Sequence, residues 1–133
     1  MSKILVTDAI APEGIDLLSS RAEVDVKRGL TPPELQETIN GYDALVVRSE
    51  TKVTPEVIQA GQSLRVIARA GIGVDNINIE AATSAGIPVV NAPIGNTVAA
   101  AEHTLALMLA LARNVPQAYQ SFKAGEWKRS AFM

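Results

Sequence analysis

The sequence contains no cysteine and only one histidine among its 133 residues. The absence of cysteine excludes disulfide bonds, thiolate metal ligands and a cysteine nucleophile, and it fits a reducing compartment. With a single histidine and scattered carboxylates there is no metal-ligand cluster, so we expect no metal site. The net charge of −2, without any block of like charges, provides no basic field for nucleic acid or an anionic membrane.

Long hydrophobic runs are missing as well. The first residues lack the apolar segment and cleavage site of a secretory signal. The most apolar stretch, residues 98–112, is interrupted by Glu102, His103 and Thr104 and is shorter than the roughly 20 residues of a membrane span. With 47% hydrophobic and 20% charged residues, the composition is typical of a folded soluble domain, and we expect a cytoplasmic protein with no membrane partner.

Short apolar runs alternate with helix signals over most of the chain. Strands are expected at residues 4–6, 24–26, 44–47, 66–68 and 89–90, and helices are expected to begin at Pro12 and after Thr31, Thr54 and Asn78. Thr31 precedes Pro32 and lies three residues before Glu34, which is typical of a capped helix start. This alternation, repeated about five times, predicts an α/β fold with a flavodoxin-like open parallel sheet and crossover helices on both faces.

The pattern changes after the fifth strand. Asn96 or Thr97 is expected to cap a long helix that runs to about Arg113 and is apolar on most sides. Such a helix is normally buried all round, and one small sheet covers only one side of it. Each uncovered leucine forgoes about 1.5–3 kcal/mol of burial, so we expect this helix to require a second domain, a second subunit, or both. A further helix is expected from about Gln117 to Ala124, ending at Gly125.

Two arginines follow neighbouring strands of the predicted sheet. In open α/β sheets, ligands bind outside the carboxyl ends of the strands, and here these ends carry Thr7–Asp8, Arg48–Ser49, Arg69–Ala70–Gly71 and Asn91–Ala92–Pro93. Arg48 and Arg69 therefore predict a site for an anion such as a carboxylate or a phosphate. The alternative is that both arginines are solvated, or that they pair with Glu50 and Asp75.

The glycine-containing turn at residues 71–73 resembles the start of a dinucleotide fingerprint. Asn76 stands where the third glycine belongs, and no long helix follows. The turn is either a loop that contacts a ligand through its backbone N–H groups, or a simple turn in which Asp75 and Asn76 bond local amides. The sequence leaves both interpretations open.

A rival class and a rival catalytic residue can be weighed from the same pattern. Receiver domains of two-component systems also have five β-α units, but they need an aspartate at the end of the third strand to accept phosphate. Arg48 occupies that position, so the receiver interpretation fails. His103 lies on the long helix, where a histidine is more often a packed residue than a catalyst, and we assign no catalytic residue in this chain.

Several segments, in this order, resemble the D-isomer-specific 2-hydroxyacid dehydrogenases, and among them the phosphoglycerate dehydrogenases. They are VVRSETKVT (residues 46–54), RAGIGVDNI (69–77), NAPIGNT (91–97) running into AEHT (101–104), and then PQA (116–118) and KAGEW (123–127). The match covers nearly the whole chain. It implies a substrate-binding domain at residues 1–96 and, at residues 97–133, an interdomain helix that begins a nucleotide-binding Rossmann domain.

The resemblance also implies an activity and a set of site residues. The activity is the NAD-dependent oxidation of 3-phosphoglycerate to 3-phosphohydroxypyruvate in serine biosynthesis. Arg48, Ser49 and Arg69 would hold the carboxylate or phosphate of this phosphorylated hydroxy acid, and the amides of Ala70 and Gly71 would contact its carboxylate.

Cofactor and assembly are implied in the same way. Ile72 and Asn96 would lie against the nicotinamide end of NAD, and residues 98–125 would form a homo-oligomer, such as a dimer. The glycine fingerprint of the family, the acidic residue that binds the ribose, and the catalytic arginine, glutamate and histidine would all lie beyond Met133. We therefore expect the chain alone to be inactive.

Two alternatives remain open. One stays within the family and is a hydroxypyruvate or glyoxylate reductase, which a comparison of phosphorylated and unphosphorylated substrates would distinguish. The other is a stand-alone, non-enzymatic binding or interaction module, which binding of anions without binding of NAD would favour.

Overall fold

The computed structural model describes residues 1–132. They divide into two compact units: a first unit, Met1–Gly95, and a second unit that begins at Asn96.

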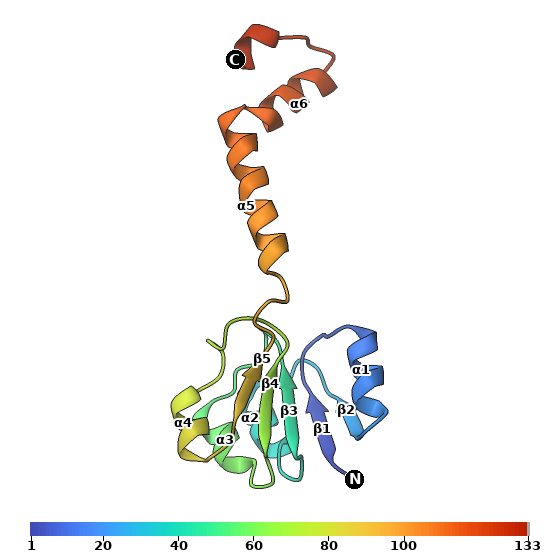
Figure 1. The fold of residues 1–133 in the computed structure, drawn as a ribbon, viewed down its shortest axis with the longest axis vertical. Helices are drawn as coiled ribbons and strands as arrows, with labels where there is room; N and C mark the ends of the chain where they lie inside the picture. Colours follow the sequence, from blue (N-terminus) through green and yellow to red (C-terminus); the bar gives the residue numbers. More distant parts are fainter. Residues whose placement is uncertain (133) are drawn as a thin grey trace. The chain divides into compact units, whose positions relative to one another are not determined.

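The first unit is built on one five-stranded parallel sheet (Figure 1). Its strands are β1 (Lys3–Val6), β2 (Glu23–Val26), β3 (Ala44–Val47), β4 (Val66–Arg69) and β5 (Val89–Asn91), in the order β2-β1-β3-β4-β5. In the register of the central strands, Leu5 pairs with Leu45, and Leu45 pairs with Ile67. This order confirms the predicted α/β fold with a flavodoxin-like open sheet.

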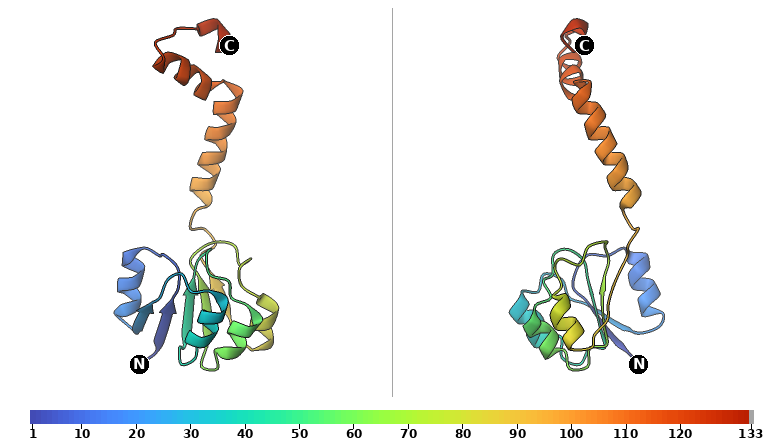
Figure 2. Two further views of the ribbon diagram at one scale, coloured as in Figure 1. Left: turned by 180° about the vertical axis from the view of Figure 1, so that it is seen from behind. Right: turned by 60° about the vertical axis from the view of Figure 1, so that its left-hand side comes forward.

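Four helices connect the strands: α1 (Pro12–Ser19), α2 (Pro32–Thr38), α3 (Pro55–Ala60) and α4 (Ile79–Ser84). Helix α1 lies on one face of the sheet, and α2, α3 and α4 lie together on the other (Figure 2). The chain steps from β1 to β2 in one direction across the sheet and from β2 onward in the other. Because crossovers between parallel strands are right-handed, α1 falls on the opposite face from the rest.

The hydrophobic core lies between the sheet and helices α2 to α4. Its fully buried members include Leu5, Leu35, Ile39, Leu45, Val47, Val57, Ile67 and Ala82. The run Leu45–Val46–Val47 is buried on both faces of the sheet, which fits a strand whose apolar residues do not alternate with polar ones.

Side chains at the starts of three helices bond the helix ends as the sequence indicated. Thr31 donates both its backbone N–H (2.8 Å) and its hydroxyl (2.7 Å) to the Glu34 carboxylate at the start of α2. The Asn78 side chain accepts a bond from the backbone N–H of Ala81 at 2.8 Å in α4. Thr54 is the N-cap of α3. These bonds satisfy donors that a helix start otherwise leaves unpaired.

The second unit contains α5 (Thr97–Ala112), α6 (Val115–Lys123) and a 3-10 turn, η1 (Arg129–Phe132). Helix α6 begins at Val115, earlier than the predicted start near Gln117. Asn114 adopts a left-handed conformation (φ 50°) directly before it, and Pro116 lies in the first turn, where its missing N–H leaves no bond unmade. Among residues 1–132, no helix combines the length and the apolar character needed to cross a membrane.

Candidate functional site

Polar residues gather at the carboxyl edge of the sheet in the first unit. All five strands are parallel, so the residues that follow β1, β3, β4 and β5 lie at the same edge. The strand order reverses between β1 and β3, which is the point where doubly wound sheets open a crevice for ligands. Asp8 follows β1 and Arg48 follows β3, so the two residues flank this point.

Arg48 places a free cation at this edge. Among residues 1–132, its guanidinium makes no hydrogen bond or ion pair, and the residue is exposed. Its backbone, in contrast, is held from two sides. The N–H donates to the Asp8 carboxylate at 2.5 Å, and the carbonyl accepts bonds from Arg69 Nε at 2.9 Å and Asn76 Nδ2 at 2.8 Å. A fixed backbone with an unpaired guanidinium is suited to bind an anion.

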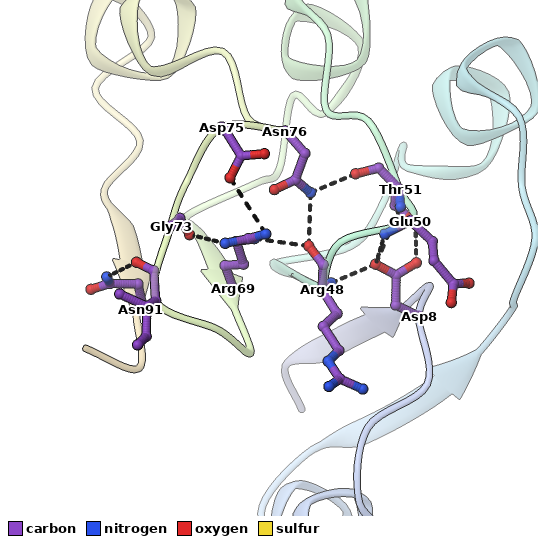
Figure 3. A network of polar contacts seen from close by, with 10 residues as sticks. Asp8, Arg48, Glu50, Thr51, Arg69, Gly73, Asp75, Asn76 and Asn91 are labelled. Atoms are coloured by element: carbon purple, nitrogen blue, oxygen red, sulfur yellow. Dashed lines mark hydrogen bonds and ion pairs between the residues drawn. The ribbon is translucent and has the colours of Figure 1, made fainter. Parts of the chain in front are cut away.

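Arg69 differs from Arg48 because its guanidinium is already engaged (Figure 3). Its side chain is only 11% exposed, and each of its three nitrogens faces an oxygen. Nε donates to the Arg48 carbonyl, Nη1 donates to the Gly73 carbonyl, and Nη2 lies 3.5 Å from Asp75 Oδ1. The pairing with Asp75 that the sequence left open as an alternative is thus present. In Figure 3 the Arg48 side chain points away from that of Arg69.

In the turn after β4, the N–H groups of Ala70 and Gly71, which were expected to contact a ligand, are already bonded within the protein. The N–H of Ala70 donates to the Val47 carbonyl at 2.8 Å, and that of Gly71 donates to the Arg69 carbonyl at 2.9 Å. A ligand contact through these two amides would require both bonds to open. Within residues 1–132, the N–H groups of residues 72–76 make no hydrogen bond, so these are the donors that the turn offers.

The turn is also tied to β5. The Asn91 side chain donates to the carbonyl of Ile72 at 2.6 Å, and the N–H of Ala92 donates to the carbonyl of Gly71 at 2.9 Å. Ile72 itself is 39% exposed, so its apolar side chain remains accessible. The loops after β3, β4 and β5 therefore form one connected polar network.

Asp8, Asn76 and Asn91 hold this network together. From the sequence, Asp8 and Asn91 were expected only to lie at strand ends, and Asn76 was expected, in one interpretation, to bond amides of its own turn. Each has a signal in the sequence. Asp8 and Asn91 lie at strand ends, and Asn76 occupies the position of the third glycine in a dinucleotide-binding fingerprint. Its side chain donates to the carbonyls of Arg48 and Thr51, at 2.8 and 2.6 Å, so it bonds the neighbouring loop and not its own turn.

The remaining predicted site residues are placed as follows. Ser49 is exposed in the loop after β3. Asn96 belongs to the second unit, in which it is the N-cap of α5. His103 is exposed on α5. Among the described residues, no three histidine, aspartate or glutamate side chains are grouped so that they could hold a metal ion.

Known proteins are similar to this chain in both sequence and fold. Residues 4–130 match the family model of the D-isomer specific 2-hydroxyacid dehydrogenase, catalytic domain. The whole chain is 54% identical to D-3-phosphoglycerate dehydrogenase from Synechocystis sp., of which it covers 24%.

Two solved structures illustrate the similarity of fold. One is the PH0520 protein from Pyrococcus horikoshii OT3, with a TM-score of 0.83 and 31% identity over 98% of this chain and 39% of that one. The other is the NAD+-bound 3-phosphoglycerate dehydrogenase of Entamoeba histolytica, with a TM-score of 0.72 and 32% identity over 82% of this chain and 38% of that one. The chain spans about a quarter of the length of the curated relatives it matches.

Proposed function

The chain belongs to the D-isomer specific 2-hydroxyacid dehydrogenase family, and from this premise we propose that it is the substrate-binding part of an enzyme that oxidises 3-phosphoglycerate. The observation that carries the proposal is the exposed, unpaired guanidinium of Arg48 at the carboxyl end of β3. In this proposal, residues 1–96 form the substrate-binding domain and residues from 97 begin the nucleotide-binding domain. We also propose that this enzyme is cytoplasmic and that it serves serine biosynthesis.

The carboxyl edge offers two kinds of contact to a phosphorylated hydroxy acid. Arg48, with Ser49 beside it, supplies a full positive charge for the phosphate or carboxylate. Arg69 and the turn that begins with Ala70 and Gly71 supply the second contact, in which unbonded N–H groups from Ile72 onward face the ligand. The guanidinium nitrogens of Arg69 already contact oxygens of the protein, so we do not expect them to bind the ligand directly. Arg69 instead contributes its positive charge and keeps the turn ordered.

The same turn is a poor site for a dinucleotide pyrophosphate and a good one for the nicotinamide end. Asn76 replaces the third glycine of a fingerprint, and its side chain bonds two carbonyls of the neighbouring loop. Ile72 offers an accessible apolar side chain suited to the face of a ring. We propose that Ile72 and Asn96 contact the nicotinamide of NAD, which accepts a hydride when bound. The role of this chain is then to orient the hydroxy acid and to exclude water from it.

Self-association is the proposed role of residues 98–125. The leucines of α5 lie on several sides of the helix and are all exposed in the second unit. A continuous apolar surface of this kind is typical of an interface. We propose a homo-oligomer in which this surface is covered.

The assignment of Arg48 is tested in the longer enzyme by steady-state kinetics with 3-phosphoglycerate. Arg48→Ala removes one charge-assisted contact, so KM should rise about 30-fold, which corresponds to about 2 kcal/mol. Arg65→Ala is the matched control. Arg65 is also exposed, but it precedes β4 at the opposite edge of the sheet, so its loss should leave KM unchanged. An unchanged KM in Arg48→Ala would overturn the assignment.

The choice of substrate is tested in parallel. If the proposal is right, the enzyme prefers 3-phosphoglycerate to unphosphorylated hydroxy acids, and Arg48→Ala reduces that preference. Equal rates with hydroxypyruvate or glyoxylate would indicate a reductase of the same family. Binding of anions without binding of NAD would indicate a non-enzymatic module.

A further inference from the structure

Asp8 is a buried carboxylate at the ligand edge that the proposed binding contacts do not use. The residue is 2% exposed and lies two residues after the end of the interior strand β1. One oxygen accepts the backbone N–H groups of Arg48 (2.5 Å), Glu50 (3.2 Å) and Thr51 (3.2 Å), and the other accepts the Thr51 hydroxyl. A buried carboxylate is costly unless it is fully hydrogen-bonded, and all four donors come from one loop.

That loop is the one that carries Arg48, and it is held from both sides. Asp8 accepts its N–H groups from the β1 side. On the β4 side, Arg69 Nε and Asn76 Nδ2 donate to its carbonyls. Three backbone N–H groups of the loop are thus bonded to Asp8 and two of its carbonyls are bonded to side chains of the β4 side, while the Arg48 guanidinium is free (Figure 3).

We propose that Asp8 is a positioning residue: its carboxylate sets where the backbone of Arg48 lies and thereby presents the guanidinium to the ligand. A long side chain on a fixed backbone loses less freedom when it binds than one on a mobile loop, so positioning favours affinity. The identity of the ligand rests on the function proposed above, but the positioning of the loop does not.

The positioning is tested by amide hydrogen exchange, measured residue by residue by NMR on the 133-residue chain. In Asp8→Ala, the amides of Arg48, Glu50 and Thr51 lose their acceptor and should exchange about tenfold faster or more. The amides of Leu45 and Ile67, in the adjoining strands, should keep their rates and so show that the sheet is intact.

Asp8→Asn separates hydrogen bonding from the filling of space. The asparagine oxygen can accept the three backbone N–H groups while its NH2 group donates to the Thr51 hydroxyl, which in turn donates to Thr7, its neighbour at 2.9 Å. These bonds are neutral and about half as strong as charge-assisted ones. Exchange should therefore be intermediate between wild type and Asp8→Ala. If Asp8 only filled space, the exchange rates of Asp8→Asn and wild type would be the same. This comparison tests the proposal even if the alanine variant does not fold.

Asp25→Ala is the matched control. Asp25 is a part-buried carboxylate on the neighbouring strand β2, and it accepts the Tyr42 hydroxyl at 2.7 Å without contacting the loop. Its removal should leave exchange at residues 48, 50 and 51 as in wild type. Unchanged exchange at these residues in Asp8→Ala would overturn the proposal.

Binding of 3-phosphoglycerate to the same variants measures the consequence. Asp8→Ala should weaken it about two- to tenfold, the fold-change expected for immobilising one long side chain, and Asp8→Asn should restore most of the affinity. If the wild-type chain does not bind 3-phosphoglycerate but the exchange rates follow the predicted order, the proposed substrate is wrong for this chain and the positioning role stands.

Discussion

The two units of the chain differ in where their hydrophobic side chains lie. In the first unit, Leu5, Leu45 and Ile67 of the sheet pack against helices α2 to α4 and have no exposed surface. In the second unit, no residue of α5 or α6 is buried, and Leu111 is 80% exposed. The first unit therefore buries a core of its own, whereas no residue of α5 or α6 is buried by the rest of the second unit.

The difference shows that the pattern of apolar residues matters more than their number. In the first unit, Leu5, Leu45 and Ile67 of the inner strands face neighbours that the same unit supplies, the apolar residues of helices α2 to α4. In α5 the large apolar residues include those at positions 105, 107, 108, 109 and 111, which lie on several sides of the helix and are all exposed. We infer that the stability of the chain resides in the first unit and that the second unit serves assembly.

The largest expected effect comes from removing a buried leucine from the first unit. Leu45→Ala leaves a cavity at the centre of the sheet and should lower the free energy of unfolding by about 2–5 kcal/mol. Leu111→Ala in α5 should change it by about 0.5 kcal/mol or less, provided that the chain is monomeric. Urea denaturation followed by circular dichroism measures both. Equal losses would show that α5 has a covered face in the isolated chain.

The next effect concerns self-association through the second unit. Leu109→Glu places a charge on the exposed apolar surface of α5, where each buried leucine would contribute about 1.5–3 kcal/mol to an interface. Sedimentation equilibrium should show a dissociation constant at least about tenfold higher than that of the wild-type chain.

Leu17→Glu controls for the added charge. Leu17 lies on α1 of the first unit and is 62% exposed, close to the 65% of Leu109. Because Leu17 lies outside the proposed interface, this variant should associate like the wild type. If both variants weaken association equally, general charge repulsion is responsible and α5 is not the interface.

The fold of the first unit follows from its sequence because the relevant signals are local. The run 44–47 lacks alternation and predicts a doubly covered strand, and Thr31 with Glu34 marks a helix start. The start of α6 was predicted two residues late, because the left-handed conformation of Asn114 has no strong local signal.

The candidate site was predictable only in part. Parallel strands bring Arg48 and Arg69 to one edge, which sequence order reveals once the sheet is predicted. The sequence did not predict that the guanidinium of Arg48 is free and that of Arg69 is bonded, because the partners of Arg69 include backbone carbonyls of Arg48 and Gly73. The role of Asp8 was missed for the same reason, because its bonds span more than forty residues of sequence.

A smaller effect tests how tightly the first unit is packed at its ligand edge. A Cβ on Gly73 would lie 2.8 Å from Asp75 Oδ1 and 3.0 Å from Arg69 Nη1. Gly73→Ala should displace the exposed Asp75 side chain and lower the free energy of unfolding by about 1 kcal/mol or less. Gly71→Ala is the control, because its Cβ would meet Arg69 Nη1 at an ordinary 3.5 Å. If the two variants denature at the same urea concentration, the Arg69–Asp75 contact does not stabilise the turn.

The smallest effect distinguishes the helix starts of the two units by pH. The pKa of Glu34 is held below its usual value of 4.5, first by the Thr31 hydroxyl and then by the Thr31 backbone N–H. No side-chain bond of this kind caps α5 or α6. A carboxyl group with a lowered pKa in the folded state contributes stability that is present above pH 4.5 and is lost as the pH falls through the lowered pKa.

The Tm of Glu34→Gln should therefore lie slightly below that of wild type near neutral pH, and the two should converge once Glu34 is protonated in the folded wild type. Glutamine still accepts bonds from Thr31, so the difference reports the charge and not the shape of the side chain. Glu37→Gln is the control for the loss of one negative charge, because it removes a carboxylate from the same helix without touching Thr31. A Tm difference that persists unchanged into acid would mean that glutamine fits the helix start less well than glutamate. The charge of the Glu34 carboxylate would then not stabilise the first unit.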